Sequence, residues 1–397
     1  MMDPTEFDFD ILIIGGGIHG VGVAQAAAAE GYSVCLLEQQ SLASGTSSRS
    51  SKLIHGGLRY LETARFHLVH ECLRERSLLL KLAPELVRIQ PFYIPIYPDT
   101  RRRPWQLQLG LSLYYFLGGL NRDCHFHRLP RRQWSTLDGL DTRGLQQVFQ
   151  YWDAQTDDAA LTRAVMKSAI TMGARLLMPA RFSHAQLLDA GCAIHYQVAG
   201  ALRCCTARVV VNAAGPWINQ VLEKITPRVT PLPIDLVQGT HIIVAGRLQQ
   251  GFYYLEAPSD QRAVFAMPWQ DHIMIGTTET IFQGDPAQVT PTHAEIRYLL
   301  ETFTHYFPAF RAVQEEQLIS SFAGLRVLSA GRRQASHRSR ETILHPDRAQ
   351  GTRLLSIYGG KLTAYRATAA TVIARLKNSL PPRQKIADTT HIPLTPA

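Results

Sequence analysis

The chain has 397 residues, of which 46% are hydrophobic and 18% are charged. This length suits about two or three domains with sizeable cores, so we expect a globular protein rather than a disordered chain. The formal net charge of +9 favours an anionic partner, such as a phosphorylated metabolite, an anionic membrane surface or nucleic acid. Because no nucleic-acid motif or basic stripe interleaved with aromatic residues occurs, no nucleic-acid partner is expected.

The sequence also indicates where the protein is located and in which state its cysteines are. No run of 18 or more apolar residues occurs, and the N-terminal stretch MMDPTEFDFD is acidic where a secretory signal is basic. We therefore expect a cytoplasmic protein. The six cysteines include no CxxC pair and no spacing typical of a metal site, which indicates reduced thiols without a disulfide or a bound metal.

The first predicted element is a βαβ unit over residues 9–38, FDILIIGGGIHGVGVAQAAAAEGYSVCLLE. Gly15, Gly17 and Gly20 form GxGxxG between the first strand and the helix, and Glu38 ends the second strand. Glycines let the backbone approach a pyrophosphate at the positive end of a helix, while the carboxylate can accept hydrogen bonds from ribose hydroxyls. The unit predicts a dinucleotide site for NAD or FAD, and the glutamate argues against NADP.

Further elements follow along the chain. Residues 65–82 predict an amphipathic helix, and another helix begins at Thr292, which forms a capping-box pattern with Glu295. Residues 101–119, RRRPWQLQLGLSLYYFLGG, indicate either a helix on an anionic membrane surface or a buried helix after a solvated arginine cluster. Strands are predicted over residues 207–214, 240–245, 262–268, 272–278 and 353–359, and a helical segment over 361–378.

The order of these elements predicts an α/β fold. Nucleotide-binding βα signals at both chain ends enclose strand-rich material, which indicates a discontinuous Rossmann-like FAD-binding domain and a second, strand-rich α+β substrate domain. We expect the FAD-binding domain over residues 1–90, 150–225 and 340–397, and the substrate domain over 91–149 and 226–339.

Two later segments favour FAD over NAD. The segment NAAGPW, residues 212–217, ends a strand with small residues that let the backbone approach a flat ring. In YGGKLTAYR, residues 358–366, Gly359, Gly360 and Lys361 stand where a strand meets a helix. The N-terminus of that helix would stabilise negative charge on a reduced flavin.

Taken together, these segments resemble the FAD-dependent glycerol-3-phosphate dehydrogenases of the D-amino-acid-oxidase-like flavoprotein superfamily. The resemblance covers nearly the whole chain, and its most specific part is KLIHGGLRYLE within TSSRSSKLIHGGLRYLE. It implies bound FAD, oxidation of sn-glycerol 3-phosphate to dihydroxyacetone phosphate, and electron delivery to a quinone or, in the oxidase branch, to oxygen. Its other segments are IIGGGIHGVGVA, YWDAQTDDA, NAAGPW, VQGTHIIV, MPW with IGTTE, AGLRVL and YGGKLTAYR.

The resemblance also implies residue roles. Arg59, Arg326 and Arg340 are expected to face the substrate phosphate with Tyr60 beside them, and guanidinium groups suit a phosphate dianion on chemical grounds. The other implied positions lie near the reacting hydroxyl and the flavin: His55, His241 and Lys361. The implied cofactor contacts are Gly15, Gly17, Gly20, Glu38, Ser47, Ser48, Gly215, Gly359, Gly360, Lys361, Leu362 and Thr363.

We expect hydride transfer from C2 of the substrate to flavin N5 while a histidine takes the hydroxyl proton, because the pKa of histidine lies near neutral pH. His55 and His241 are both candidates for this base, and Lys361 is expected to stabilise negative charge. The two glycines after His55 are interpreted as positions where the backbone passes close to flavin or substrate.

Some positions depart from the family pattern. His19 stands where asparagine is usual, Glu279 where aspartate is usual and Val327 where proline is usual, and the C-terminal helical domain of typical members is expected to be absent. The electron acceptor, a homodimer and peripheral attachment to the inner face of the cytoplasmic membrane therefore stay open, as does another phosphorylated or carboxylated alcohol as substrate. Two alternatives are a flavin oxidase of amino or hydroxy acids and a non-catalytic flavin-binding subunit.

Overall fold

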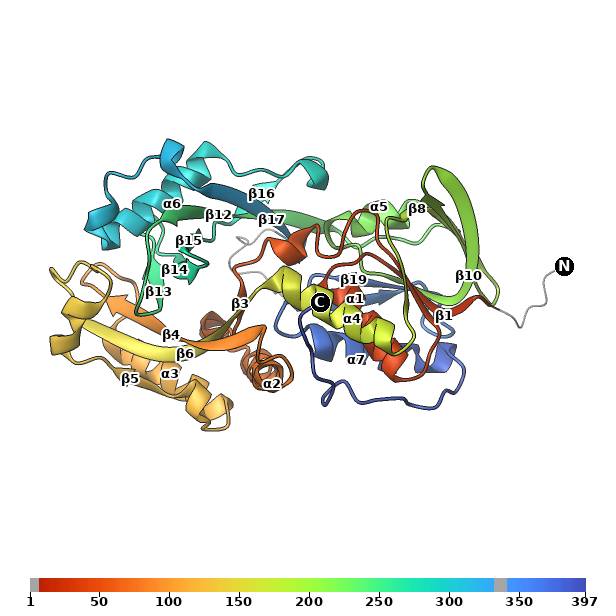
Figure 1. The fold of residues 1–397 in the computed structure, drawn as a ribbon, viewed down its shortest axis with the longest axis horizontal. Coiled ribbons are helices and arrows are strands. Elements are labelled where there is room, and N and C mark those ends of the chain that lie inside the picture. The colour runs from red at the N-terminus through yellow and green to blue at the C-terminus, as the bar shows by residue number, and fades with distance from the viewer. Residues whose placement is uncertain (1–6, 332–340) are drawn as a thin grey trace.

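A computed structural model describes residues 7–331 and 341–397 and places two β-sheets side by side, with helices packed against each (Figure 1). In this part of the chain no helix is long and apolar enough to cross a bilayer. All six cysteines are free thiols, and Cys204 alone among them is exposed. The α-helices of the described residues are α1 (Ile18–Ala29), α2 (Phe66–Leu82), α3 (Pro104–Leu117), α4 (Asp158–Thr171), α5 (Ile218–Leu222), α6 (His293–Tyr306) and α7 (Tyr365–Leu376).

The first sheet is built around a parallel core in the order β7, β2, β1, β10 and β19. The central strands are apolar and buried on both faces, as is typical of parallel sheets covered by helices. Its strands are β1 (Phe9–Ile14), β2 (Val34–Leu37), β7 (Arg175–Leu177), β8 (Arg181–Leu188), β9 (Gly191–Val198), β10 (Ala201–Asn212), β11 (Ile225–Thr226), β18 (Ile343–Pro346) and β19 (Leu354–Tyr358).

The parallel arrangement brings four chain segments to one edge of the first sheet. The carboxyl ends of parallel strands meet at the same edge, which is where ligands bind in open α/β sheets. Gly15 follows β1, Glu38 follows β2, Ala213 follows β10 and Gly359 follows β19. Helix α1 connects β1 to β2 and shares a buried apolar cluster with α4 and α7.

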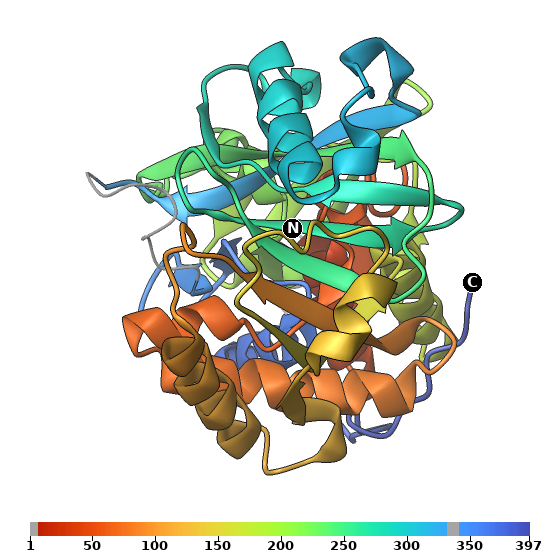
Figure 2. The same cartoon turned by 90° about the vertical axis from the view of Figure 1, so that its left-hand side faces the viewer.

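The second sheet is mainly antiparallel, with one parallel pair between β4 and β13. Helices cover both of its faces: Phe92 of β4 packs in an apolar cluster with α2 and α3, whereas the adjacent Tyr93 packs in a cluster with α6 (Figure 2). Its strands are β3 (Leu53–Ile54), β4 (Val87–Ile96), β5 (Phe126–Arg128), β6 (Gln147–Thr156), β12 (Ile234–Ala245), β13 (Phe252–Glu256), β14 (Ala263–Trp269), β15 (His272–Gly276), β16 (Thr280–Phe282) and β17 (Ser320–Ser329).

The predicted α/β fold class is confirmed, and each predicted helix and strand is present with its ends shifted by up to six residues. The capping box of α6 is present, because the Thr292 hydroxyl accepts the N–H of Glu295 at 3.3 Å and the Thr292 N–H donates to the Glu295 carboxylate at 3.2 Å. The boundaries of the two domains stay a prediction.

A buried polar network connects the second sheet to the segment that follows β3. Arg76 of α2 lies 2.6 Å from the Asp153 carboxylate of β6, and their side chains are 0% and 2% exposed. Tyr114 of α3 donates its hydroxyl to Asp153 at 2.7 Å and accepts the N–H of Gly56 at 2.9 Å. The network therefore joins α2, β6 and α3 to the turn at residues 55–57.

We predict that Asp153→Asn destabilises the protein by about 3–5 kcal/mol, because it leaves the buried Arg76 guanidinium without its counter-charge. Urea denaturation gives the free energy of unfolding. The matched control is Asp271→Asn, which disrupts the exposed ion pair with Arg247, and we expect no measurable loss of stability in it. Equal losses in the two variants would contradict the assignment of stability to the buried pair.

Candidate active site

A cavity of about 810 Å³ extends from the carboxyl edge of the first sheet to the second sheet. This volume lies in the upper part of the range of roughly 300–1000 Å³ that is common for ligand sites. Its wall includes Gly15 and Glu38 at one end and Arg59, Tyr254 and Phe265 at the other. A long ligand can therefore contact both sheets at once.

The glycines after β1 form a cradle at the N-terminus of α1. Gly15 has φ of +109°, and a Cβ at Gly20 would lie 1.9 Å from the Gly15 carbonyl oxygen, so the helix can approach the turn only without that side chain. Gly17 is the N-cap, and a Cβ there would meet one described atom within 4 Å, the Ser47 hydroxyl oxygen at 3.1 Å. Ser47 accepts the N–H of Ile18 at 2.9 Å. This helix end suits an anionic pyrophosphate.

Glu38 is held at the edge of the cavity by backbone donors. Its two carboxylate oxygens accept the N–H groups of Gly16 at 2.7 Å and Gln40 at 2.8 Å, and the residue is 7% exposed. A carboxylate has about four acceptor positions, so it can still accept from ribose hydroxyls. Ser48 is not among the described residues of the wall, and its hydroxyl donates to the Gly45 carbonyl at 3.3 Å.

The opposite side of the cradle is formed by segments after β10 and β19. Gly215, Gly359 and Gly360 all line the cavity with positive φ angles of +53°, +71° and +109°, respectively. A Cβ at Gly215 would find no described atom within 4 Å, so the space beside it is open. Leu362 and Thr363 complete this wall. The open space beside Gly215 fits a flat ring, and together with the helix end this wall fits FAD.

His19 packs against this part of the wall. A Cβ at Gly360 would lie 2.0 Å from His19 Nε2, so the glycine makes room for the imidazole. Burial lowers the pKa of His19 to about 4, which keeps the ring neutral at physiological pH.

The turn after β3 carries the predicted substrate residues. Gly57 has φ of +75°, and a Cβ there would lie 2.3 Å from the Tyr60 ring. For Gly56 the expected close approach to flavin or substrate is wrong, because a Cβ would meet Leu73 and Tyr114 at 2.5 Å. The two glycines thus accommodate protein side chains that fix the shape of the turn.

Cationic side chains gather at the second-sheet end of the cavity. Arg59, Tyr60, Arg326 and Lys361 all line it. The Tyr60 ring lies close to two cations, with Arg59 Cζ 5.7 Å and Lys361 Nζ 4.9 Å from its centroid. Arg340, the third predicted phosphate ligand, lies outside the described residues.

The lack of a side chain at Gly239 makes room for Arg326. A Cβ at Gly239 would lie 2.7 Å from both Arg326 Nη2 and Thr277 Oγ1. Arg326 donates to the Thr277 hydroxyl at 3.1 Å, so it lies against the β12 backbone with its guanidinium held toward the loop after β15.

The two candidate histidines occupy different environments. His55 is partly exposed and lines the cavity, and its N–H donates to the Thr363 hydroxyl at 3.1 Å. His241 is 1% exposed and is not among the described wall residues; its Nε2 lies 2.9 Å from Ser51 Oγ. Burial, followed by the charges of Arg326 and Lys52, lowers the pKa of His241 to about 3. His241 is therefore a weak base at neutral pH.

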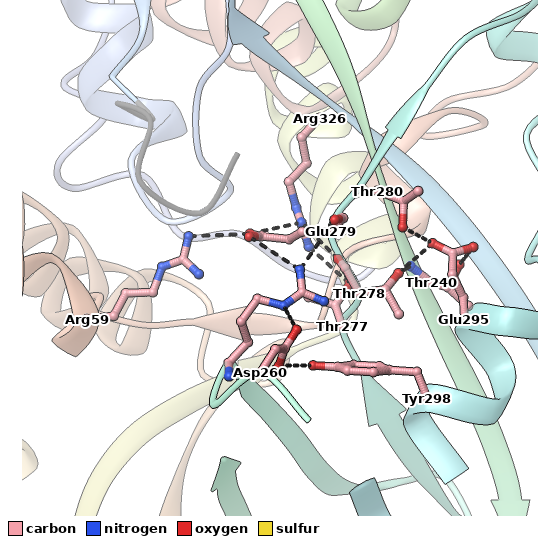
Figure 3. A network of polar contacts seen from close by, with 11 residues as sticks. Arg59, Thr240, Asp260, Thr277, Thr278, Glu279, Thr280, Glu295, Tyr298 and Arg326 are labelled. Atoms are coloured by element: carbon pink, nitrogen blue, oxygen red, sulfur yellow. Dashed lines mark hydrogen bonds and ion pairs between the residues drawn. The ribbon is translucent and has the colours of Figure 1, made fainter. Parts of the chain in front are cut away.

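Several polar residues near the site form a network that the sequence does not predict. Glu279 lies among the guanidinium groups of Arg59 and Arg326 (Figure 3), and Arg262 also approaches its carboxylate. Glu279 ends the IGTTE segment of the family resemblance, whereas nothing in the sequence around Arg262 indicates its position.

Lys52 makes contacts that hold the protein together. Its ammonium group lies 2.6 Å from the Asp158 carboxylate, and it is 5.3 Å from the centroid of the Trp269 ring. Since Lys52 is 5% exposed, the ion pair anchors the active-site segment to α4.

Comparisons with known proteins agree with this geometry. A family model described as FAD dependent oxidoreductase matches residues 10–366. The chain is 39% identical to a glycerol-3-phosphate dehydrogenase of Pseudomonas aeruginosa over 378 residues, 94% of this chain and 72% of that protein. It is 36% identical to a D-erythritol 1-phosphate dehydrogenase of Brucella abortus over 389 residues, 96% of this chain and 76% of that protein. The glycerol-3-phosphate dehydrogenase from Bacillus halodurans, solved with FAD, superposes with a TM-score of 0.76 at 28% identity, over 98% of this chain and 68% of that chain.

The two histidines with lowered pKa values predict acid sensitivity. Their folded-state pKa values are about 4 for His19 and about 3 for His241, below the usual value of 6.5. Between about pH 6.5 and pH 4 the unfolded chain binds protons that the folded protein does not, so stability falls as pH falls. Each histidine should contribute about 1.4 kcal/mol per pH unit to this slope. Urea denaturation from pH 7 to pH 4 measures it.

The control variant is His241→Gln, which removes one titrating group and should flatten the slope by about one proton. A slope identical to that of the unsubstituted protein would show that His241 is not protonated on unfolding.

Proposed function

Since the chain belongs to the FAD dependent oxidoreductase family, we propose that it oxidises sn-glycerol 3-phosphate to dihydroxyacetone phosphate. The observation that carries this proposal is the pair of arginines on the cavity wall, Arg59 and Arg326, at the end away from the FAD cradle. The named relatives act on glycerol 3-phosphate and D-erythritol 1-phosphate, which both join a phosphate to a polyol. A flavin oxidase of amino acids would not need a paired guanidinium site of this kind.

The proposed phosphate ligands are Arg59, Arg326 and Arg340, with Tyr60 beside them. Guanidinium groups remain charged and can donate two parallel hydrogen bonds to phosphate oxygens. The Tyr60 ring supports this site because both the Arg59 guanidinium and the Lys361 ammonium group lie near its centroid.

For the oxidation step we assign the proton acceptor to His55, with His241 as the alternative. His55 lines the cavity, whereas His241 is buried with a pKa lowered to about 3, so His55 is better placed to take the proton of the C2 hydroxyl. Lys361, also on the wall, stabilises the negative charge that develops as the proton leaves. Bound FAD supplies the hydride-accepting chemistry. The cofactor-binding roles proposed for the glycines, Glu38, Ser47, Leu362 and Thr363 are supported by their places on or beside the wall.

We further propose that a quinone accepts the electrons and that α3 attaches the protein to the inner face of the cytoplasmic membrane. One face of α3 is buried in the core, but Trp105, Leu109 and Phe116 are 65%, 65% and 68% exposed. Arg101 and Arg103, just before the helix, are exposed as well. Apolar side chains beside arginines suit the surface of an anionic bilayer. A homodimer stays a prediction.

The proposed function is tested by anaerobic titration of the FAD-bound protein with glycerol 3-phosphate. We expect the absorbance of oxidised flavin to bleach completely, with little or no bleaching by D-amino acids or 2-hydroxy acids. D-Erythritol 1-phosphate is included as the second candidate substrate because of the relative named for it. Failure of every phosphorylated polyol to reduce the flavin would refute the proposal.

Arg59→Ala should raise the substrate concentration for half-reduction by about tenfold or more, because hydrogen bonds to charged groups contribute about 1.5–3 kcal/mol. FAD content should not change. Arg247→Ala, which alters an exposed arginine paired with Asp271, is the matched control and should titrate like the parent protein.

Membrane attachment is tested by sedimentation with anionic liposomes at low salt. We expect the protein to sediment with them and the triple variant Trp105→Ser, Leu109→Ser, Phe116→Ser to stay in solution while its flavin is still reduced by substrate. The control is Ile170→Ser, Leu202→Ser, Ile386→Ser, which changes exposed apolar residues elsewhere on the surface. A parent protein that does not sediment would overturn this assignment.

A further inference from the structure

A buried carboxylate lies behind Arg59 and Arg326, the two arginines that define the anion end of the cavity. The Glu279 side chain is 6% exposed, whereas those of Arg59 and Arg326 are 30% and 23% exposed. Glu279 Oε1 lies 3.6 Å from Arg59 Nη2 and 3.5 Å from Arg326 Nη1. Both arginines are wall residues of the cavity, and the described wall does not include Glu279. The glutamate therefore contacts the cations from the protein side.

A second guanidinium-carboxylate pair borders the same position. Arg262 Nη1 lies 4.0 Å from Glu279 Oε2, and its Nε donates to Asp260 at 2.7 Å. Tyr298 of α6 donates its hydroxyl to Asp260 at 2.9 Å (Figure 3). Arg262 therefore pairs with Asp260 as well as approaching Glu279, and Glu279 places a negative charge close to Arg59 and Arg326.

The loop that carries Glu279 is anchored on its other side by a different glutamate. Thr278 and Thr280, the residues on either side of Glu279, donate their hydroxyls to Glu295 Oε1 at 2.7 Å and 3.0 Å. Thr240 of β12 donates to Glu295 Oε2 at 3.0 Å (Figure 3). Glu295 is 5% exposed and belongs to the capping box of α6. These hydrogen bonds hold the loop in place and thereby fix the position of the Glu279 carboxylate.

The charges explain why the carboxylate is needed. Arg59 and Arg326 come from distant parts of the chain and carry like charges, which repel each other where they converge. One carboxylate oxygen within 3.6 Å of both offsets this repulsion. A guanidinium has five N–H donors, and a contact along one edge leaves its geometry suited to a second anion. The same negative charge opposes the binding of any further anion.

We infer that Glu279 is a positioning residue that orients Arg59 and Arg326 toward the substrate and lowers the affinity of the anion end for simple anions. This inference rests on the proposed function for the identity of the substrate. It assigns to Glu279 two effects of opposite sign: placement of the substrate, which favours reaction, and electrostatic opposition, which disfavours inorganic phosphate.

The test compares Glu279→Gln and Glu279→Asp with the parent holoenzyme. Inorganic phosphate binding is measured by the change that it causes in the flavin absorption spectrum, without turnover, and stopped-flow spectroscopy measures the limiting rate of flavin reduction by glycerol 3-phosphate. For Glu279→Gln we expect phosphate to bind about fivefold more tightly, since a negative charge is removed, and reduction to be about tenfold slower, since the arginines lose their alignment.

Glu279→Asp keeps the charge but withdraws the carboxylate, so we expect phosphate affinity close to that of the parent and slower reduction. This variant also serves if the glutamine protein does not fold. Glu30→Gln, which changes a carboxylate 3.4 Å from Lys385, is the matched control and should alter neither quantity. A parent-like reduction rate in both Glu279 variants, or unchanged phosphate affinity in Glu279→Gln, would overturn the inference. If glycerol 3-phosphate does not reduce the parent flavin, the proposed function fails, and the phosphate titration still decides the electrostatic effect of Glu279.

Discussion

The candidate site depends on one geometric constraint: β1, β2, β10 and β19 run parallel, so their carboxyl ends meet at one edge of a sheet. The residues that follow these strands are far apart in sequence, and strand pairing is what brings them to one cavity. Glycine follows β1 and β19 because each chain segment turns away from the strand with positive φ, and because a Cβ at Gly15 would lie 2.7 Å from the Ala213 carbonyl oxygen. The cradle is therefore a consequence of sheet topology combined with small residues at strand ends.

The substrate end depends on how the residues on both sides of β3 are held in place. Three side chains from different elements fasten it. Asp158 of α4 pairs with Lys52, Thr363 before α7 accepts the N–H of His55, and Tyr114 of α3 accepts the N–H of Gly56. Buried backbone donors need partners, so these contacts satisfy the turn as well as position it. A short segment outside the regular ladders thereby acquires a defined shape, and Arg59 is presented to the cavity from it.

The polar residues of the site form two groups: charged carboxylates and neutral histidines. Glu295 is stabilised by hydroxyl donors that lower its pKa, although burial opposes this shift, and it fixes the loop beside it. Glu279 is instead balanced by guanidinium groups that also face the cavity. No described carboxylate favours protonation of His19 or His241, and desolvation keeps both rings neutral. The result is a cavity with Arg59 and Arg326 on its wall, to which the imidazoles of His19 and His241 add no positive charge at neutral pH.

Short-range patterns in the sequence determined the βαβ unit, the capping box of α6 and the glycines of the cradle, because each depends on residues within a few positions of one another. Together with the KLIHGGLRYLE segment they also indicated the family, which the comparisons confirm. The tertiary structure decided that His55 lines the cavity while His241 is buried, and that Glu279 lies among arginines contributed by three separate segments. Burial and Coulomb interactions depend on neighbours that are distant in the chain, so no local pattern carries them.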